Sequence, residues 1–184
     1  MANSYKYNNA SKLTEHFSVS EFRCKCGQTH DTLIDPKLPE MLEKLRTKLG
    51  CKAITVNSGY RCAAHDKSVG GNGIGMHTKG LAADIVCIGR DGKPISSKIV
   101  SCAAQDIGFC GIANIDSSYT ATHLDVRTDN RWFGNEVVTT AYSVTSDFYS
   151  YYKLTRADVY GSEPLTGTLT LGDKRYKITA EEES

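Results

Sequence analysis

The stretch "GMHTKGLAADIVCI" (residues 75–88) combines two features that decide the fold of this chain. Its second half, "LAADIVCI" (81–88), is a short apolar run that predicts a buried strand. Its first half is a turn, in which Gly80 lets the chain bend tightly. His77 and Asp84 stand on either side of this bend, and both side chains can bind a metal ion. The stretch therefore predicts either a metal site at the start of the strand or a plain turn that leads into it.

Further helices and strands are expected around this strand. Apolar residues at helical spacing, with a terminating glycine, predict two amphipathic helices. The predicted helices cover residues 35–50 and 95–108, and the predicted strands cover 53–61, 81–88, 110–115 and 122–127. Because helices and strands are segregated rather than strictly alternating, the fold class is α+β, with a small antiparallel sheet and flanking helices.

Composition limits the partners of the chain. The sequence has 184 residues, of which 40% are hydrophobic, enough for the core of one compact domain. Lys and Arg (22) nearly balance Asp and Glu (21), which disfavours a nucleic-acid partner. No apolar run is long enough for a membrane span, and the first residues have no signal-peptide core. We expect a monomer without a membrane or nucleic-acid partner.

The strand predicted over 122–127, "THLDVR", carries a second pair of metal-competent side chains. Strand alternation turns Leu124 and Val126 toward the core and turns His123 and Asp125 together toward the other face. Two such groups would be costly to bury without partners. A site shared with His77 and Asp84 would satisfy them.

The segment "CKCGQTH" offers a separate set of ligands. Cys24, Cys26 and His30 are candidates for a structural metal site, although one residue between two cysteines is tighter than usual and no fourth ligand is evident. A redox pair or plain loop cysteines are the alternatives.

The two ends of the chain differ from its centre. Residues 1–11 are polar and expected to fray. After residue 135 the sequence is rich in Thr, Val and Tyr, and a hairpin is predicted that turns at Gly172–Asp173. We expect a catalytic domain over 1–135 and a β-rich extension of unknown role over 136–184. Its tyrosines would be half-buried strand residues or a sugar-stacking platform.

The motifs "SGYRCAAHDKSVGG" (58–71), "HTKGLAADI" (77–85) and "THLDVR" (122–127) together resemble the zinc D-alanyl-D-alanine carboxypeptidase family. The similarity is to its branch of phage endolysins and LAS-type peptidoglycan peptidases, relatives of the L-alanyl-D-glutamate endolysins, and it runs from about residue 13 to 132. It implies a hedgehog/DD-peptidase-like fold and hydrolysis of a peptide bond in the peptidoglycan stem peptide. It also implies that one catalytic Zn²⁺ is bound by His77, Asp84 and His123.

The same resemblance assigns substrate-binding residues. Arg61 matches the arginine that holds a substrate carboxylate, and its guanidinium can offer two donors to both oxygens. Ser58 and Tyr60 belong to the same motif and are expected to shape the pocket. A phage lysin of this kind would be made in the bacterial cytoplasm and reach the wall after holin-type release.

The chain departs from the family pattern at two positions. Gly75 stands where a serine is common, and Thr120 stands where some relatives place an acidic general base. Asp125 is therefore the expected general base, with Asp116 a weaker candidate. Alternatively, Asp125 is the third metal ligand and His123 acts as the base.

Three other functions are compatible with parts of the sequence. Cys62 and His65 suggest a cysteine peptidase, although helical neighbours at this spacing rarely form a dyad. A non-catalytic, zinc-containing module that binds the cell wall is the main alternative, and a structural phage protein is a third. The sequence leaves open whether the enzyme is a carboxypeptidase or an endopeptidase.

Overall fold

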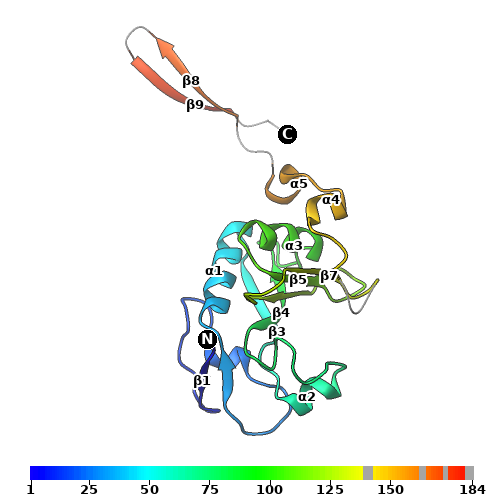
Figure 1. Cartoon of the computed structure of the whole chain (residues 1–184). Coiled ribbons are helices and arrows are strands. Elements are labelled where there is room, and N and C mark those ends of the chain that lie inside the picture. The colour runs from blue at the N-terminus through cyan, green and yellow to red at the C-terminus, as the bar shows by residue number, and fades with distance from the viewer. Residues whose placement is uncertain (139–142, 162–164, 172–173, 181–184) are drawn as a thin grey trace.

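A five-stranded sheet forms the centre of the molecule (Figure 1). The computed structural model describes residues 1–138 and 143–161, and the backbone of residues 165–171 and 174–180. The order of the strands across the sheet is β3 (Ala53–Ser58), β4 (Ala82–Ile88), β6 (Thr122–Asp125), β5 (Gly111–Asn114) and β7 (Trp132–Asn135). All neighbours pair antiparallel except β5 and β7, which are parallel. The strand prediction is confirmed, and β7 adds an element that the sequence did not reveal.

Two helices, α1 (Lys37–Leu49) and α3 (Ser97–Asp106), pack against the sheet and bury its apolar face (Figure 1). Ala83, Ile85 and Leu124 are fully buried in the core that the helices cover. Strand alternation turns Asp84 and His123 to the opposite face. Both predicted helices are confirmed. One face of the sheet packs against them, and the other carries these two candidate metal ligands.

The N-terminal segment wraps the edge of this domain. β1 (Asn3–Tyr5) pairs antiparallel with β2 (Thr32–Ile34), so the expectation that residues 1–11 fray is wrong for the paired residues. A 3-10 turn, η1 (Val19–Phe22), follows Ser18, whose backbone N–H donates to the Glu21 carboxylate at 2.7 Å. These two residues form a capping box, and Phe22 at the end of the turn is buried in the core.

Residues 143–161 form part of the same core. They contain α4 (Phe148–Tyr152) and α5 (Arg156–Tyr160), where the sequence predicted β structure. Phe148 is fully buried and stacks on Phe133 of β7, with ring centroids 4.9 Å apart. Packing against the core overrides the β propensity of this Thr- and Tyr-rich segment. Its tyrosines are therefore helical residues packed against the core rather than strand residues.

Beyond this core lies the predicted hairpin. β8 (Leu165–Leu171) and β9 (Lys174–Ala180) pair antiparallel. The expected turn at Gly172–Asp173 lies outside the described residues. None of the helices in the described part of the chain has the length and apolar character needed to cross a bilayer.

Candidate metal centre and pocket

The register of the sheet brings two candidate ligands side by side. Asp84 of β4 is the direct cross-strand partner of His123 of β6. His77 reaches them from the loop before β4, where Gly80 has a φ of +71°. A Cβ at Gly80 would lie 2.5 Å from the backbone of Leu33, so both the dihedral angle and the space require glycine. The bend that the sequence predicted is confirmed.

The three side chains form a small triangle of donor atoms. His77 Nε2 lies 3.1 Å from His123 Nδ1 and 3.2 Å from Asp84 Oδ1, and His123 Nδ1 lies 2.9 Å from Asp84 Oδ1. Zinc bonds of about 2.0–2.1 Å in a tetrahedron separate the ligand atoms by about 3.3 Å. All three residues are buried and could hold a metal ion. The donor set therefore fits zinc in both chemistry and spacing.

Hydrogen bonds on the far side of each ring select the nitrogen that faces the triangle. His77 Nδ1 lies 2.7 Å from the Gly59 carbonyl oxygen, which can only accept, so this nitrogen carries the proton and Nε2 is free. His123 Nε2 lies 3.2 Å from Asp125 Oδ2, which leaves Nδ1 for the triangle. Such partners orient histidine ligands in metal sites.

Asp125 is held behind His123 rather than in the pocket. It is 0% exposed, and it accepts hydrogen bonds from Arg127 Nε at 2.8 Å and from Arg127 Nη2. Burial alone would raise the pKa of Asp125, but the bonds from Arg127 and His123 hold it well below its usual range. The geometry does not favour Asp125 as the general base, because both oxygens are already bonded and water has no access to them.

His123 lies between two carboxylates, those of Asp84 and Asp125. Burial alone would lower the pKa of His123. The hydrogen bonds and negative charges of Asp125 and Asp84 have the larger effect and raise this pKa to about 10. In the same way, burial would raise the pKa of Asp84, yet the two histidines hold it well below its usual range. A buried positive charge is thus favoured at this point, and a metal ion can supply it.

Arg61 lies on the pocket wall and links three acceptors. Its Nε donates to Ser58 Oγ at 2.8 Å, Nη1 donates to Asp66 at 3.4 Å, and Nη2 donates to Asp84 Oδ2. Arg61 therefore orients a candidate metal ligand as well as facing the pocket. Tyr60 lies elsewhere, because its ring meets the edge of His30 with centroids 5.8 Å apart.

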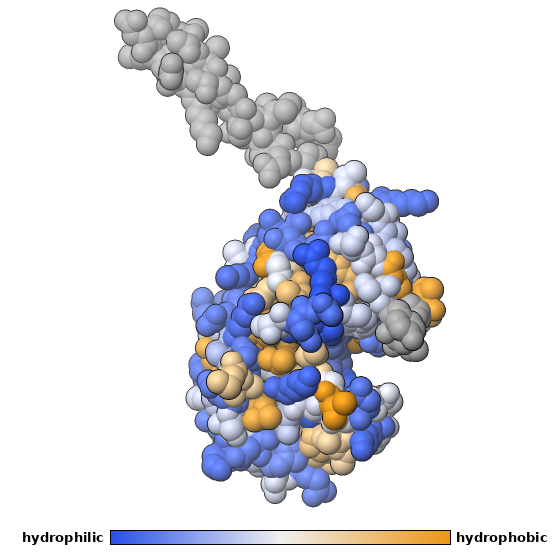
Figure 2. Space-filling view, viewed as in Figure 1, coloured by the Kyte–Doolittle hydropathy of each residue, from blue (hydrophilic) through white to orange (hydrophobic). Residues whose placement is uncertain are grey.

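The three candidate ligands open onto a pocket of about 420 Å³. Figure 2 shows the hollow between the region of α2 (Ala63–Ser68) and the region of β7. Residues of the glycine-rich loop line one side, and Trp132 and Glu136 line the other. The loop residues are Gly71, Asn72, Gly75 and Met76, and the other lining residues are Arg61, Asp66, Ile115 and Arg127. The pocket is large enough for a short peptide segment.

Glu136 is a pocket residue that the sequence did not indicate. The residue as a whole is exposed, but desolvation of its carboxyl by the pocket walls raises the pKa above its usual value. Nearby Asp84 also raises this pKa, and His123 lowers it. It follows a strand that the sequence did not predict, so no motif pointed to it. A carboxylate with a raised pKa in a metal-competent pocket is a candidate general base.

The remaining sequence candidates have structural partners instead. Asp116 closes the turn before β6, where it accepts backbone N–H groups from Thr120 and Ala121, each at 2.9 Å. The ring of His65 faces Ser68 and not the thiol of Cys62, which accepts only the His65 backbone N–H at 3.4 Å. No pairing suited to a cysteine nucleophile therefore exists between them.

Comparison with known proteins agrees with this arrangement. A family model described as Peptidase M15 matches residues 15–125, which include all three candidate ligands. No curated protein matches the chain.

Proposed function

Because the chain belongs to the peptidase M15 family, whose members are zinc metallopeptidases of peptidoglycan, we propose that its pocket hydrolyses a peptide bond of the stem peptide. Within the family we propose a phage endolysin, acting as a D-Ala-D-Ala carboxypeptidase or as an endopeptidase. The observation that carries this proposal is the triangle of donor atoms, 2.9–3.2 Å apart, at the floor of one pocket. His77, Asp84 and His123 would hold the zinc ion.

Zinc in such a site lowers the pKa of bound water toward about 7 and polarises a carbonyl group. The protein supplies the proton transfers. We assign the general base to Glu136, which accepts a proton from the attacking water and returns it to the leaving amine. Its carboxyl lines the pocket beside the candidate ligands, and its raised pKa favours uptake of a proton from water.

The other polar residues orient these groups. Asp125 and Arg127 hold the ring of His123, and the Gly59 carbonyl holds that of His77. Arg61 is proposed to bind a substrate carboxylate at the pocket wall, supported by its position in the lining. Trp132, whose ring meets the edge of His123 at 5.7 Å, forms an apolar wall for the peptide.

We also propose a revised division of the chain. Residues up to about 161 form the catalytic domain, since Phe148 and Val159 lie in its core. The hairpin of β8 and β9 is then the appendage.

The test compares two variants on purified peptidoglycan. Glu136→Gln should keep zinc and lose turnover by about 10²- to 10⁴-fold, whereas His77→Ala should lose the pocket zinc and turnover together. Mass spectrometry of the released muropeptides separates loss of terminal D-Ala from cleavage within the stem. If the wild type binds zinc and walls but releases no amine, the chain is the non-catalytic wall-binding module instead. Full hydrolysis by the Glu136→Gln variant would exclude Glu136 as the base.

A further inference from the structure

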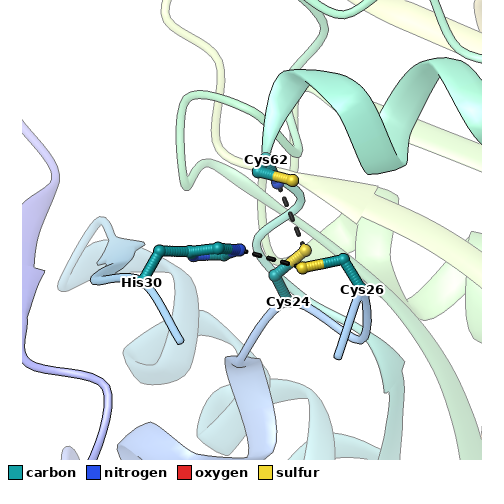
Figure 3. A group of neighbouring side chains, drawn as sticks. All are labelled: Cys24, Cys26, His30 and Cys62. Atoms are coloured by element: carbon teal, nitrogen blue, oxygen red, sulfur yellow. Dashed lines mark hydrogen bonds between the residues drawn. The ribbon is translucent and has the colours of Figure 1, made fainter. Parts of the chain in front are cut away.

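A second cluster of metal-competent side chains lies outside the pocket. Cys24 and Cys26 come from the loop after η1, His30 comes from the approach to β2, and Cys62 is the N-cap of α2. Figure 3 shows the thiols of Cys24 and Cys26 and the imidazole of His30 close together, with Cys62 beside them. One ligand atom from each of the four lies within 4.8 Å of all the others.

Each of the three sulfur atoms accepts a backbone N–H. The N–H of Cys62 donates to Cys24 Sγ at 3.3 Å. The N–H groups of Gln28 and His65 donate to Cys26 Sγ and Cys62 Sγ, both at 3.4 Å. Amide donors stabilise the negative charge of a thiolate, which is the form that binds metals. Each sulfur therefore has a backbone donor that a metal-bound thiolate would retain.

His30 is oriented as the fourth ligand. Its Nδ1 lies 3.1 Å from the Asp31 carbonyl oxygen, which accepts the proton, and Nε2 lies 3.0 Å from Cys26 Sγ. A backbone carbonyl on the far nitrogen is the arrangement that orients metal-bound histidines. The edge contact with Tyr60 further fixes the plane of the ring.

We propose that Cys24, Cys26, His30 and Cys62 bind one structural zinc ion. Three thiolates and one imidazole are a preferred zinc donor set, and four protein ligands leave no position for water or substrate. Zn–S bonds of about 2.3 Å separate tetrahedral sulfurs by about 3.8 Å, so ligand atoms that all lie within 4.8 Å of one another need only small shifts. The segment "CKCGQTH" supplies three of these ligands, and Cys62 is the fourth ligand that the segment lacks.

This ion would join two segments that are distant in sequence. It would tie the loop after η1 to the first turn of α2, and Cys62 directly follows Arg61 of the pocket wall. The proposal does not depend on the proposed peptidase activity, because none of the four ligands lines the pocket.

The test uses the reduced full chain with its zinc replaced by cobalt. Thiolate ligands give Co²⁺ an intense charge-transfer band in the near ultraviolet, whereas the His77, Asp84 and His123 set has no thiolate. We expect this band in the wild type and in His77→Ala, together with two zinc ions per wild-type chain and one per His77→Ala chain. Cys26→Ser and Cys62→Ser should lose the band and one zinc.

Cys110→Ser is the matched control, since Cys110 is also half-buried but lies outside the cluster. It should keep the band and both ions. A reduced wild type without the band would overturn the proposal, and this result does not depend on whether a serine variant folds. Mass spectrometry of unfolded protein alkylated without reductant gives a second reading. Seven modified thiols agree with a metal site, whereas a disulfide within the cluster would overturn it.

Discussion

A single methyl group at Gly111 should weaken zinc binding at the pocket site without contacting any of the three zinc ligands. Gly111 of β5 is the cross-strand partner of Asp125. A Cβ at this position would lie 2.0 Å from Asp125 Oδ2, and real contacts of this kind are not shorter than 3.0 Å. Asp125 must therefore move by at least about 1 Å. Its bond to His123 Nε2, now 3.2 Å, would then exceed hydrogen-bond length or change direction.

We expect Gly111→Ala to lower zinc affinity at the pocket by about 10- to 100-fold, the usual effect of losing a residue that orients a ligand. Overpacking should also lower the free energy of unfolding by about 1–3 kcal/mol. The assay is chelator competition followed by zinc content, with denaturant unfolding alongside. Gly75→Ala is the control, because a Cβ there meets only Asn72 Oδ1 at 3.8 Å. Equal zinc affinity of the two variants would refute the orienting role of Asp125.

Three further predictions concern substrate binding, acid stability and the core. Arg61→Lys should raise the Michaelis constant for stem peptides by about 10-fold, because lysine keeps the charge but loses the forked donors; an unchanged constant would count against carboxylate binding. Hydrogen bonds from Ser150 and Gln105 lower the pKa of Asp147 to about 2, so its contribution to stability is complete above about pH 4 and disappears as the pH falls toward 2. The stability difference between wild type and Asp147→Asn, measured by urea unfolding, should narrow over that range and not widen. Phe148→Ala should lower the free energy of unfolding by about 3–5 kcal/mol, and a loss below 1 kcal/mol would show that α4 lies outside the core.

Much of the fold was predictable because its signals are local. Apolar spacing and the terminal Gly50 were enough for α1, and alternation in "THLDVR" was enough to separate Leu124 from His123. The convergence of His77 with Asp84 was suggested by the bend at Gly80, which both its dihedral angle and its surroundings require. The cost of burying His123 and Asp125 without partners suggested that they share a site with this pair, and the family resemblance assigned His123 as a ligand.

The misses have physical causes. The helices α4 and α5 are short and rich in β-forming residues, and their signals were caps rather than periodicity. Asp147 accepts the backbone N–H of Ser150 at 2.9 Å, and Thr155 forms a capping box with Asp158. These caps were readable in the sequence and outweigh propensity once the core is available.

The roles of Glu136 and Cys62 depended on tertiary structure. Glu136 reaches the pocket only because β7 pairs in parallel with β5, which no local pattern specified. Cys62 meets Cys24 from 38 residues further along the chain, after β2, α1 and β3, and single-sequence reasoning has no measure of such a distance. Asp125 was correctly assigned to the face of His123, but its partner Arg127, two residues further along, occupies both oxygens.

The five residues from Ser58 to Cys62 serve several neighbours at once. The Gly59 carbonyl steadies His77, Arg61 steadies Asp84, and the Cys62 N–H and thiol belong to the sulfur cluster. A Cβ at Gly59 would also lie 2.6 Å from Phe22 Cα. A chimeric peptidase built from this protein should therefore contain the whole stretch together with the loop after η1, because exchanging one residue at a time would disturb contacts on two sides.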